Sequence, residues 1–98
     1  MQVHVVSRFY AGPGAKELFD LLDERKADVE ALLRGVDGLV SYTLFWTENG
    51  GVSVTVCRDK AGTDESVRVA REWIVKNAPH LEVGPPALAE GDVIVHVA

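Results

Sequence analysis

The fold of this chain is decided by residues 36–78, which read VDGLVSYTLFWTENGGVSVTVCRDKAGTDESVRVAREWIVKNA. Apolar and polar residues alternate over residues 39–47 and again over residues 52–58, and this period of two is typical of β-strands. The motif ENGG at residues 48–51 favours a tight turn, because Asn and Gly accept the positive φ that such turns require. The stretch therefore predicts a β-hairpin followed by a helix.

The predicted helix after the hairpin spans residues 61–78. Thr63 is the expected N-cap, and Asp64 and Glu65 suit the positive end of the helix dipole. Pro79 is expected to end the helix, because the residue before a proline avoids helical geometry.

The flanking segments complete the pattern. Residues 3–10 are short and β-rich and predict a first strand, and leucines at helical spacing over residues 15–35 predict one long helix. Residues 80–91 are expected to form a loop, with a short extended piece within it as an alternative. Alternating valines over residues 92–98 predict the last strand.

The order β-α-β-β-α-β over residues 1–98 predicts a single α+β domain of ferredoxin-like architecture. Both crossovers should be right-handed, which places two helices on one face of a four-stranded antiparallel sheet. The other face would be open, and a second copy of the chain packing sheet against sheet would cover it. The residues expected on that open face are Ser53, Thr55, either Tyr42 or Phe45, and members of the set His4, Val6, Arg8, Ile94 and His96.

Composition limits the classes of partner. The chain has 98 residues and a formal net charge of −5, and its ten basic residues are scattered, so neither nucleic acid nor an anionic membrane surface is expected to bind. The single cysteine, Cys57, excludes an internal disulfide. No apolar run has the length of a signal peptide or of a membrane span, and a cytoplasmic protein is expected.

Three stretches carry a resemblance to a known superfamily. They are GLVSYTL at residues 38–44, GGVSVTV at residues 50–56 and the helical segment between Asp64 and Trp73. Together they look like the dimeric α+β barrel superfamily, and in particular like small proteins related to antibiotic-biosynthesis monooxygenases. The resemblance implies a homodimer whose two sheets form a barrel, with a pocket between sheet and helices in each subunit. Members include cofactor-free quinol oxygenases, haem-degrading enzymes and proteins without known activity, so this fold does not settle function.

His4, Arg8 and His96 are the candidate catalytic residues. The first and last strands are antiparallel neighbours in this topology, so His4 and His96 are expected to approach each other across the sheet. A neutral imidazole acts as a base or a metal ligand, and the alternative is that both lie partly exposed at the sheet margin. Arg8 would bind an anionic substrate if it pointed into the pocket, and the alternative is an ion pair with a carboxylate of the protein.

Tyr42, Trp46 and Trp73 are the candidate ligand-binding residues. Large aromatic side chains that carry a polar group suit flat ligands such as quinols. Tyr42 and Trp46 share one face of their strand, where they either line a pocket or pack against the helices. Trp73 lies on the apolar stripe of its helix, so a place in the core is its alternative.

The side chains that haem-degrading relatives use are not matched. Those relatives use an Asn on the first strand, a Trp, and a His on the second helix. Here the first strand has no Asn, and His80 lies beyond Pro79. Two candidate histidines without a third ligand make a poor metal site, so no metal and no cofactor are expected.

Three functions are open on the sequence. The first is a homodimer that binds a small, partly aromatic molecule in the pocket between sheet and helices, without established chemistry. The second is a cofactor-free monooxygenase acting on a quinol-like or aromatic substrate, in which one side chain accepts a proton. The third is a purely structural or interaction module. No catalytic motif in the chain decides among them.

Overall fold

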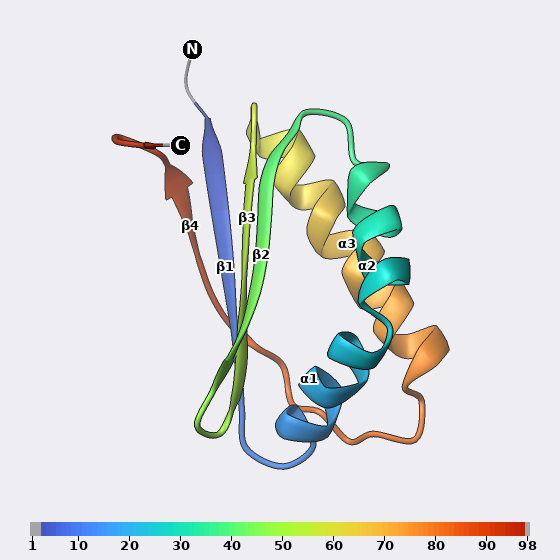
Figure 1. Cartoon of the computed structure of the whole chain (residues 1–98). Coiled ribbons are helices and arrows are strands. Elements are labelled where there is room, and N and C mark those ends of the chain that lie inside the picture. The colour runs from blue at the N-terminus through green and yellow to red at the C-terminus, as the bar shows by residue number, and fades with distance from the viewer. Residues whose placement is uncertain (1–2, 98) are drawn as a thin grey trace.

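The computed structural model describes residues 3–97 and has an α+β fold in two layers. Four strands form one antiparallel sheet in the order β2-β3-β1-β4, and the helices lie together against one face of it (Figure 1). The elements in chain order are β1 His4–Ala11, α1 Ala15–Glu24, α2 Lys26–Arg34, β2 Leu39–Thr47, β3 Gly50–Cys57, α3 Lys60–Asn77 and β4 Ala87–Asp92. The predicted ferredoxin-like architecture is confirmed, with the first helix present as two.

The β2–β3 hairpin forms at the predicted place, but for a different local reason. Thr47 pairs with Gly50, and no residue of this turn has a positive φ. The two glycines are instead needed for close approach. A Cβ on Gly50 would lie 2.1 Å from the Tyr10 carbonyl oxygen, and one on Gly51 would lie 2.2 Å from a ring carbon of Phe19.

The helices cover the face of β3 that carries small side chains, which corrects the predicted assignment of faces. Phe19 of α1 packs on Gly51, and Gly62 of α3 packs on Cys57. Ser53 and Thr55 lie on the same face and are buried. Small residues on the central strand let the helices approach closely, so the valines of β3 point to the opposite side of the sheet.

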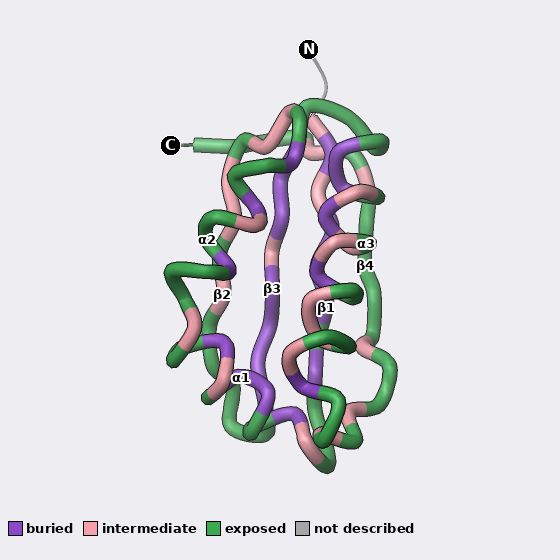
Figure 2. The backbone as a smooth tube through the Cα atoms, turned by 90° about the vertical axis from the view of Figure 1, so that its right-hand side faces the viewer, coloured by how far each residue is buried: buried purple, intermediate pink, exposed green. Residues whose placement is uncertain are grey.

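Side chains of β1 point to the same side of the sheet as the β3 residues with which they pair. Arg8 pairs with Ser53 and Val6 pairs with Thr55, so these β1 residues also face the helices. They are therefore not on the open face where the sequence placed them. Figure 2 shows that the buried residues concentrate on β1 and β3 and on the inner sides of the helices. The core lies in this layer, where Leu18 and Leu33 are almost completely buried.

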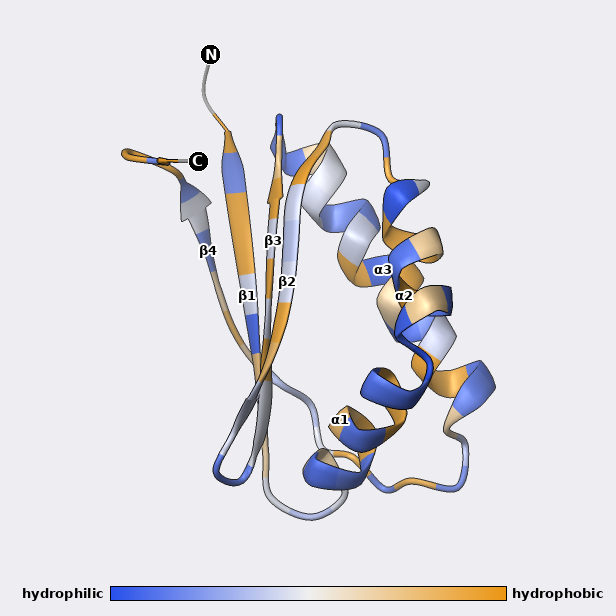
Figure 3. Cartoon of the chain, viewed as in Figure 1, coloured by the Kyte–Doolittle hydropathy of each residue, from blue (hydrophilic) through white to orange (hydrophobic). Residues whose placement is uncertain are grey.

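The opposite face of the sheet is not covered by any described element (Figure 1). Phe9 and Phe45 flank Val52 there in one cross-strand row, and the two rings are 49% and 47% exposed. Much of β1, β2 and β3 is hydrophobic in Figure 3. An exposed apolar row of this kind is unusual on a monomeric protein.

Two helix predictions need correction. The segment predicted as one helix changes direction at Arg25, whose φ of −107° and ψ of 26° separate α1 from α2. The N-cap of α3 is Asp59, not Thr63, because the Asp59 Oδ1 atom accepts a hydrogen bond of 3.0 Å from the Gly62 amide. Among residues 3–97, no helix is both long and apolar enough to cross a membrane.

The last strand also differs from its prediction. β4 spans Ala87–Asp92, so it lies in the predicted loop of residues 80–91 and shares only Asp92 with the predicted strand of residues 92–98. Its partner β1 begins at His4, opposite Asp92, so pairing ends where the alternating valines begin. Ile94 is 96% exposed, so the apolar run that predicted a strand lies largely in solvent.

Candidate functional site

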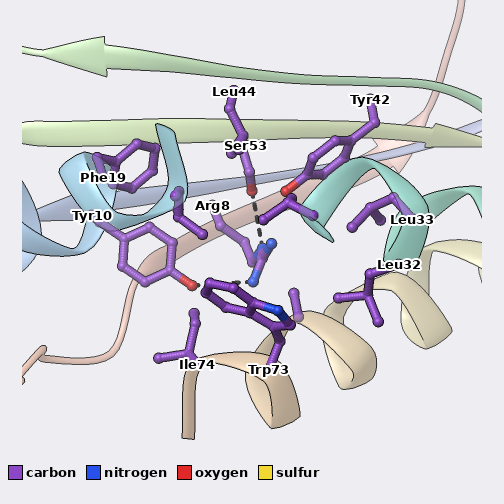
Figure 4. A pocket seen from close by; sticks show the side chains of 13 residues that line it. Arg8, Tyr10, Phe19, Leu32, Leu33, Tyr42, Leu44, Ser53, Trp73 and Ile74 are labelled. Carbon is purple, nitrogen blue, oxygen red and sulfur yellow. Dashed lines mark hydrogen bonds between the residues drawn. The ribbon is translucent and has the colours of Figure 1, made fainter. Parts of the chain in front are cut away.

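A small cavity lies between the sheet and the helices, at the middle of the core layer. Its volume is about 20 Å³, which is room for about one water molecule. Aliphatic side chains and Phe19 form most of its wall. The side chains with polar groups that line it are Arg8, Tyr10, Tyr42, Ser53 and Trp73 (Figure 4).

Arg8 is the centre of this polar group and is only 4% exposed. Its Nε atom donates a hydrogen bond of 3.0 Å to the Ser53 hydroxyl, and its Nη1 atom donates one of 3.1 Å to the Tyr10 hydroxyl. Strand register explains both contacts, because Ser53 is the cross-strand partner of Arg8 and Tyr10 is two residues along the same face. The guanidinium is thus held in a fixed orientation.

The charge of Arg8 has no counterion among residues 3–97, since no carboxylate lies within 4.0 Å of it there. Arg25, Arg34 and Arg68 each have a carboxylate partner on the surface. A buried charge that is hydrogen-bonded only to neutral hydroxyls keeps a large part of its desolvation cost. The site therefore favours a negatively charged group beside Arg8.

Tyr42 does not supply that negative charge. Burial raises the pKa of the Tyr42 phenol, and the neighbouring Arg8 opposes this rise only in part. The phenol is therefore neutral near pH 7 and available as a hydrogen-bond donor. Together Arg8 and Tyr42 present donors from two strands toward the cavity (Figure 4).

Trp73 forms the helical side of the cavity and lies close to the break between α1 and α2. The Arg25 guanidinium is 5.7 Å from the Trp73 ring centroid, and it also pairs with Asp28 at 2.7 Å. The indole is half-buried. A cation over an aromatic ring stabilises this arrangement modestly, so the helical wall at Trp73 is held by surface contacts.

The other predicted site residues lie elsewhere. Trp46 is 55% exposed and borders a separate hollow of about 160 Å³ beside Phe45 and α1. His4 is buried at the far end of β1, where its Nδ1 atom is 2.8 Å from the Thr63 hydroxyl and its Nε2 atom is 3.7 Å from Glu90.

The expected approach of His4 and His96 is wrong. His4 lies opposite Asp92, and His96 lies beyond the end of β4, where it is exposed. The prediction depended on the misplaced last strand. Neither histidine lines the cavity that contains Arg8.

Ser53 is the site residue that the sequence did not single out, because its contact with Arg8 depends on the β1–β3 register. Tyr10 gave a clearer signal, since it follows Arg8 by two residues in a predicted strand. Cys57 is fully buried, and burial raises the pKa of its thiol with Asp59 adding to the rise. Within residues 3–97, no group of three His, Cys, Asp or Glu side chains is placed to hold a metal ion.

Comparison with known proteins gives the fold. No family model and no curated protein matches the chain. A protein of unknown function from Nitrosomonas europaea, NE2512, superposes with a TM-score of 0.70 at 18% identity, over 99% of this chain and 93% of that one. A monooxygenase from the ActVA-Orf6 gene of Streptomyces coelicolor, in complex with Nanaomycin D, has a TM-score of 0.65 at 16% identity, over 99% and 91%.

A dimeric ferredoxin-like protein from an uncultured marine organism has a TM-score of 0.61 at 16% identity, over 99% of this chain and 97% of that one. The chain shares the fold of these proteins. Dimeric ferredoxin-like and antibiotic-biosynthesis-monooxygenase-like structures are among its structural neighbours, in agreement with the resemblance found in the sequence. At these identities the likeness is one of fold.

Proposed function

We propose that this chain is a homodimeric protein that binds a small aromatic molecule between its sheet and its helices. The observation that carries the proposal is Arg8, a buried cation with no counterion among residues 3–97, which faces a cavity lined by Tyr10, Tyr42 and Trp73. Apolar and aromatic walls with a few convergent polar groups are typical of small-molecule sites.

Binding in this cavity requires the helical wall to open, because about 20 Å³ is far smaller than an aromatic ligand. The break between α1 and α2 at Arg25 lies beside the half-buried Trp73, which forms the helical side of the cavity. Short helices on either side of a break move more readily than one continuous helix. A ligand would displace the Trp73 indole and take its place against Tyr42.

The two tryptophans provide the test. Trp73 lines the cavity and Trp46 does not, so each indole N–H signal reports a different place in NMR spectra of isotope-labelled protein. Titration with 2-naphthol is expected to shift the Trp73 signal and to leave the Trp46 signal in place, with Trp46→Phe to assign the pair. Equal shifts at both indoles, or none at saturating 2-naphthol, would contradict the proposal.

A cofactor-free monooxygenase is the second candidate, and the neighbour from Streptomyces coelicolor, a monooxygenase in complex with Nanaomycin D, favours it. Arg8 would stabilise a substrate oxyanion beside the neutral Tyr42 phenol. Oxygen uptake with 1,4-naphthalenediol tests this candidate. Uptake by the wild type above that of Arg8→Met supports it, whereas equal uptake by both proteins contradicts it.

A further inference from the structure

A second and larger cavity reaches Arg8 from the other side. Its volume is about 290 Å³, and it lies between α3, β4 and the segment of residues 83–86. Val67 and Val75 of α3, Leu88 of β4 and the Pro85-Pro86 pair supply apolar walls. The volume is close to the lower end of the range for small-molecule sites, so this cavity accommodates a ligand without movement of the helices.

The charges around this cavity have one sign. Arg8 from β1 and Arg71 from α3 are the charged side chains among the described residues that line it, and no carboxylate belongs to that lining. Within residues 3–97, neither guanidinium has a carboxylate within 4.0 Å. In a chain with 15 acidic and 10 basic residues, two unpaired arginines at one cavity are a local excess of positive charge.

Arg8 joins this cavity to the smaller one. Arg8, Tyr10 and Ile74 line both cavities, so Arg8 borders each of them. Its Nε and Nη1 atoms donate to the Ser53 and Tyr10 hydroxyls, and the Tyr42 hydroxyl lies beside it, so its described side-chain partners are all neutral. A carboxylate is the group that best matches such a guanidinium.

The wall formed by the segment before β4 and by β4 itself is pre-shaped. Pro85 and Pro86 have a fixed φ, which restricts the segment that leads into β4. Leu88 is 50% exposed on the helix-facing side of β4, so it forms an apolar rim that solvent reaches. A rigid rim reduces the conformational entropy that a ligand would otherwise remove on binding.

We propose that the cavity between α3 and β4 binds a small carboxylic acid with an apolar body, with its carboxylate between Arg8 and Arg71. This inference deepens the proposed function, because Arg8 belongs to both cavities. It adds a chemical class for the ligand and a residue, Arg71, that lies outside the core.

The test compares 2-naphthoate with its neutral isostere 2-naphthamide by isothermal titration. Wild-type protein is expected to bind the carboxylate at least about tenfold more tightly than the amide. Arg71→Gln is expected to lose about tenfold in naphthoate affinity and to leave the amide unchanged. Arg58→Gln is the matched control, because it removes the same charge from an exposed arginine outside this cavity and should bind both compounds as the wild type does.

Two results would overturn the inference: equal affinity for the two compounds, or an Arg71→Gln protein that binds naphthoate as tightly as Arg58→Gln. Methyl NMR separates this failure from failure of the proposed function. Naphthoate in the cavity between α3 and β4 shifts the Val75 and Leu88 methyl signals, whereas a ligand in the inner cavity shifts the Trp73 indole signal. A Trp73 shift with 2-naphthol but no Leu88 shift with naphthoate would retain the proposed function and reject the carboxylate site.

Discussion

Arg8 carries a positive charge into the core, where it donates to the hydroxyls of Ser53 and Tyr10 and lies beside that of Tyr42. Such a group is weak evidence for stability, because desolvation offsets its hydrogen bonds. The buried charge of Arg8 is therefore expected to serve ligand binding and not the stability of the fold.

Replacement of Arg8 by Met tests the separation of these roles. We expect the free energy of unfolding of Arg8→Met to be unchanged or higher by about 1 kcal/mol, since an apolar side chain of similar length removes the desolvation cost. Urea unfolding measures this value. A loss of more than about 2 kcal/mol, the size expected when a needed buried hydrogen bond is broken, would mean that Arg8 is structural.

The raised pKa of Tyr42 predicts how the stability of the protein changes at alkaline pH. Burial raises the pKa of its phenol above the ordinary value of 10.0, so the folded protein keeps the proton at a pH where the unfolded chain loses it. The stability that this group contributes is complete below about pH 10 and falls as pH rises above it. Urea unfolding between pH 8 and pH 11 should therefore show a steeper decline for the wild type than for Tyr42→Phe. Parallel curves would contradict the raised pKa.

The elements show how much of this fold the sequence predicts. The order of strands and helices follows from hydrophobic periodicity and from the turn at residues 48–51, and it is confirmed. Periodicity does not say which side of a strand meets the helices, however. The valine side of β3 was the apparent core side, yet the side with Gly51 and Ser53 is covered.

The last strand could not be located from its own residues. β4 reads ALAEGD and is mostly exposed, so it has neither alternation nor β-branched residues to mark it. Its place is set by pairing with β1, which is a tertiary effect. The same cause explains which predicted site residues come together. Arg8, Tyr42 and Trp73 were predicted as site residues, and they line one cavity. The predicted approach of His4 and His96 depended on the misplaced strand.

Gly51 tests the reason why the helices lie on the small-residue face. Gly51→Ala would place a Cβ 2.2 Å from a ring carbon of Phe19, and we expect a loss of about 1–3 kcal/mol in urea unfolding. Gly91→Ala on β4 is the matched control, because a Cβ there meets nothing within 4 Å. Equal stabilities of the two variants would show that α1 does not pack on Gly51 as described.

In the part of the molecule that the structure describes, one face of the sheet is uncovered, and the row of Phe9, Val52 and Phe45 crosses it. A second copy that packs against this face would bury the row, and this is the basis of the proposed homodimer. The neighbour from an uncultured marine organism, a dimeric ferredoxin-like protein, has the same fold.

Phe9→Lys tests the homodimer. We expect the wild type to have twice the chain mass of 10.6 kDa in size-exclusion chromatography with light scattering, and the variant to shift toward one chain, since a buried unpaired lysine is costly. Val75→Lys is the control, because Val75 is an exposed valine of α3 on the helical side. A monomeric wild type, or a dimer that Phe9→Lys leaves intact, would be the contrary result.

The most direct test of whether Arg8 serves a ligand is isothermal titration of 2-naphthoate into the wild type and into Arg8→Met. Both cavities that could receive the ligand share this one guanidinium, so its removal should abolish binding wherever the carboxylate lies. Saturable heat with the wild type and none with a folded Arg8→Met protein is the expected result. Equal affinities in the two proteins would contradict a ligand-binding role for Arg8.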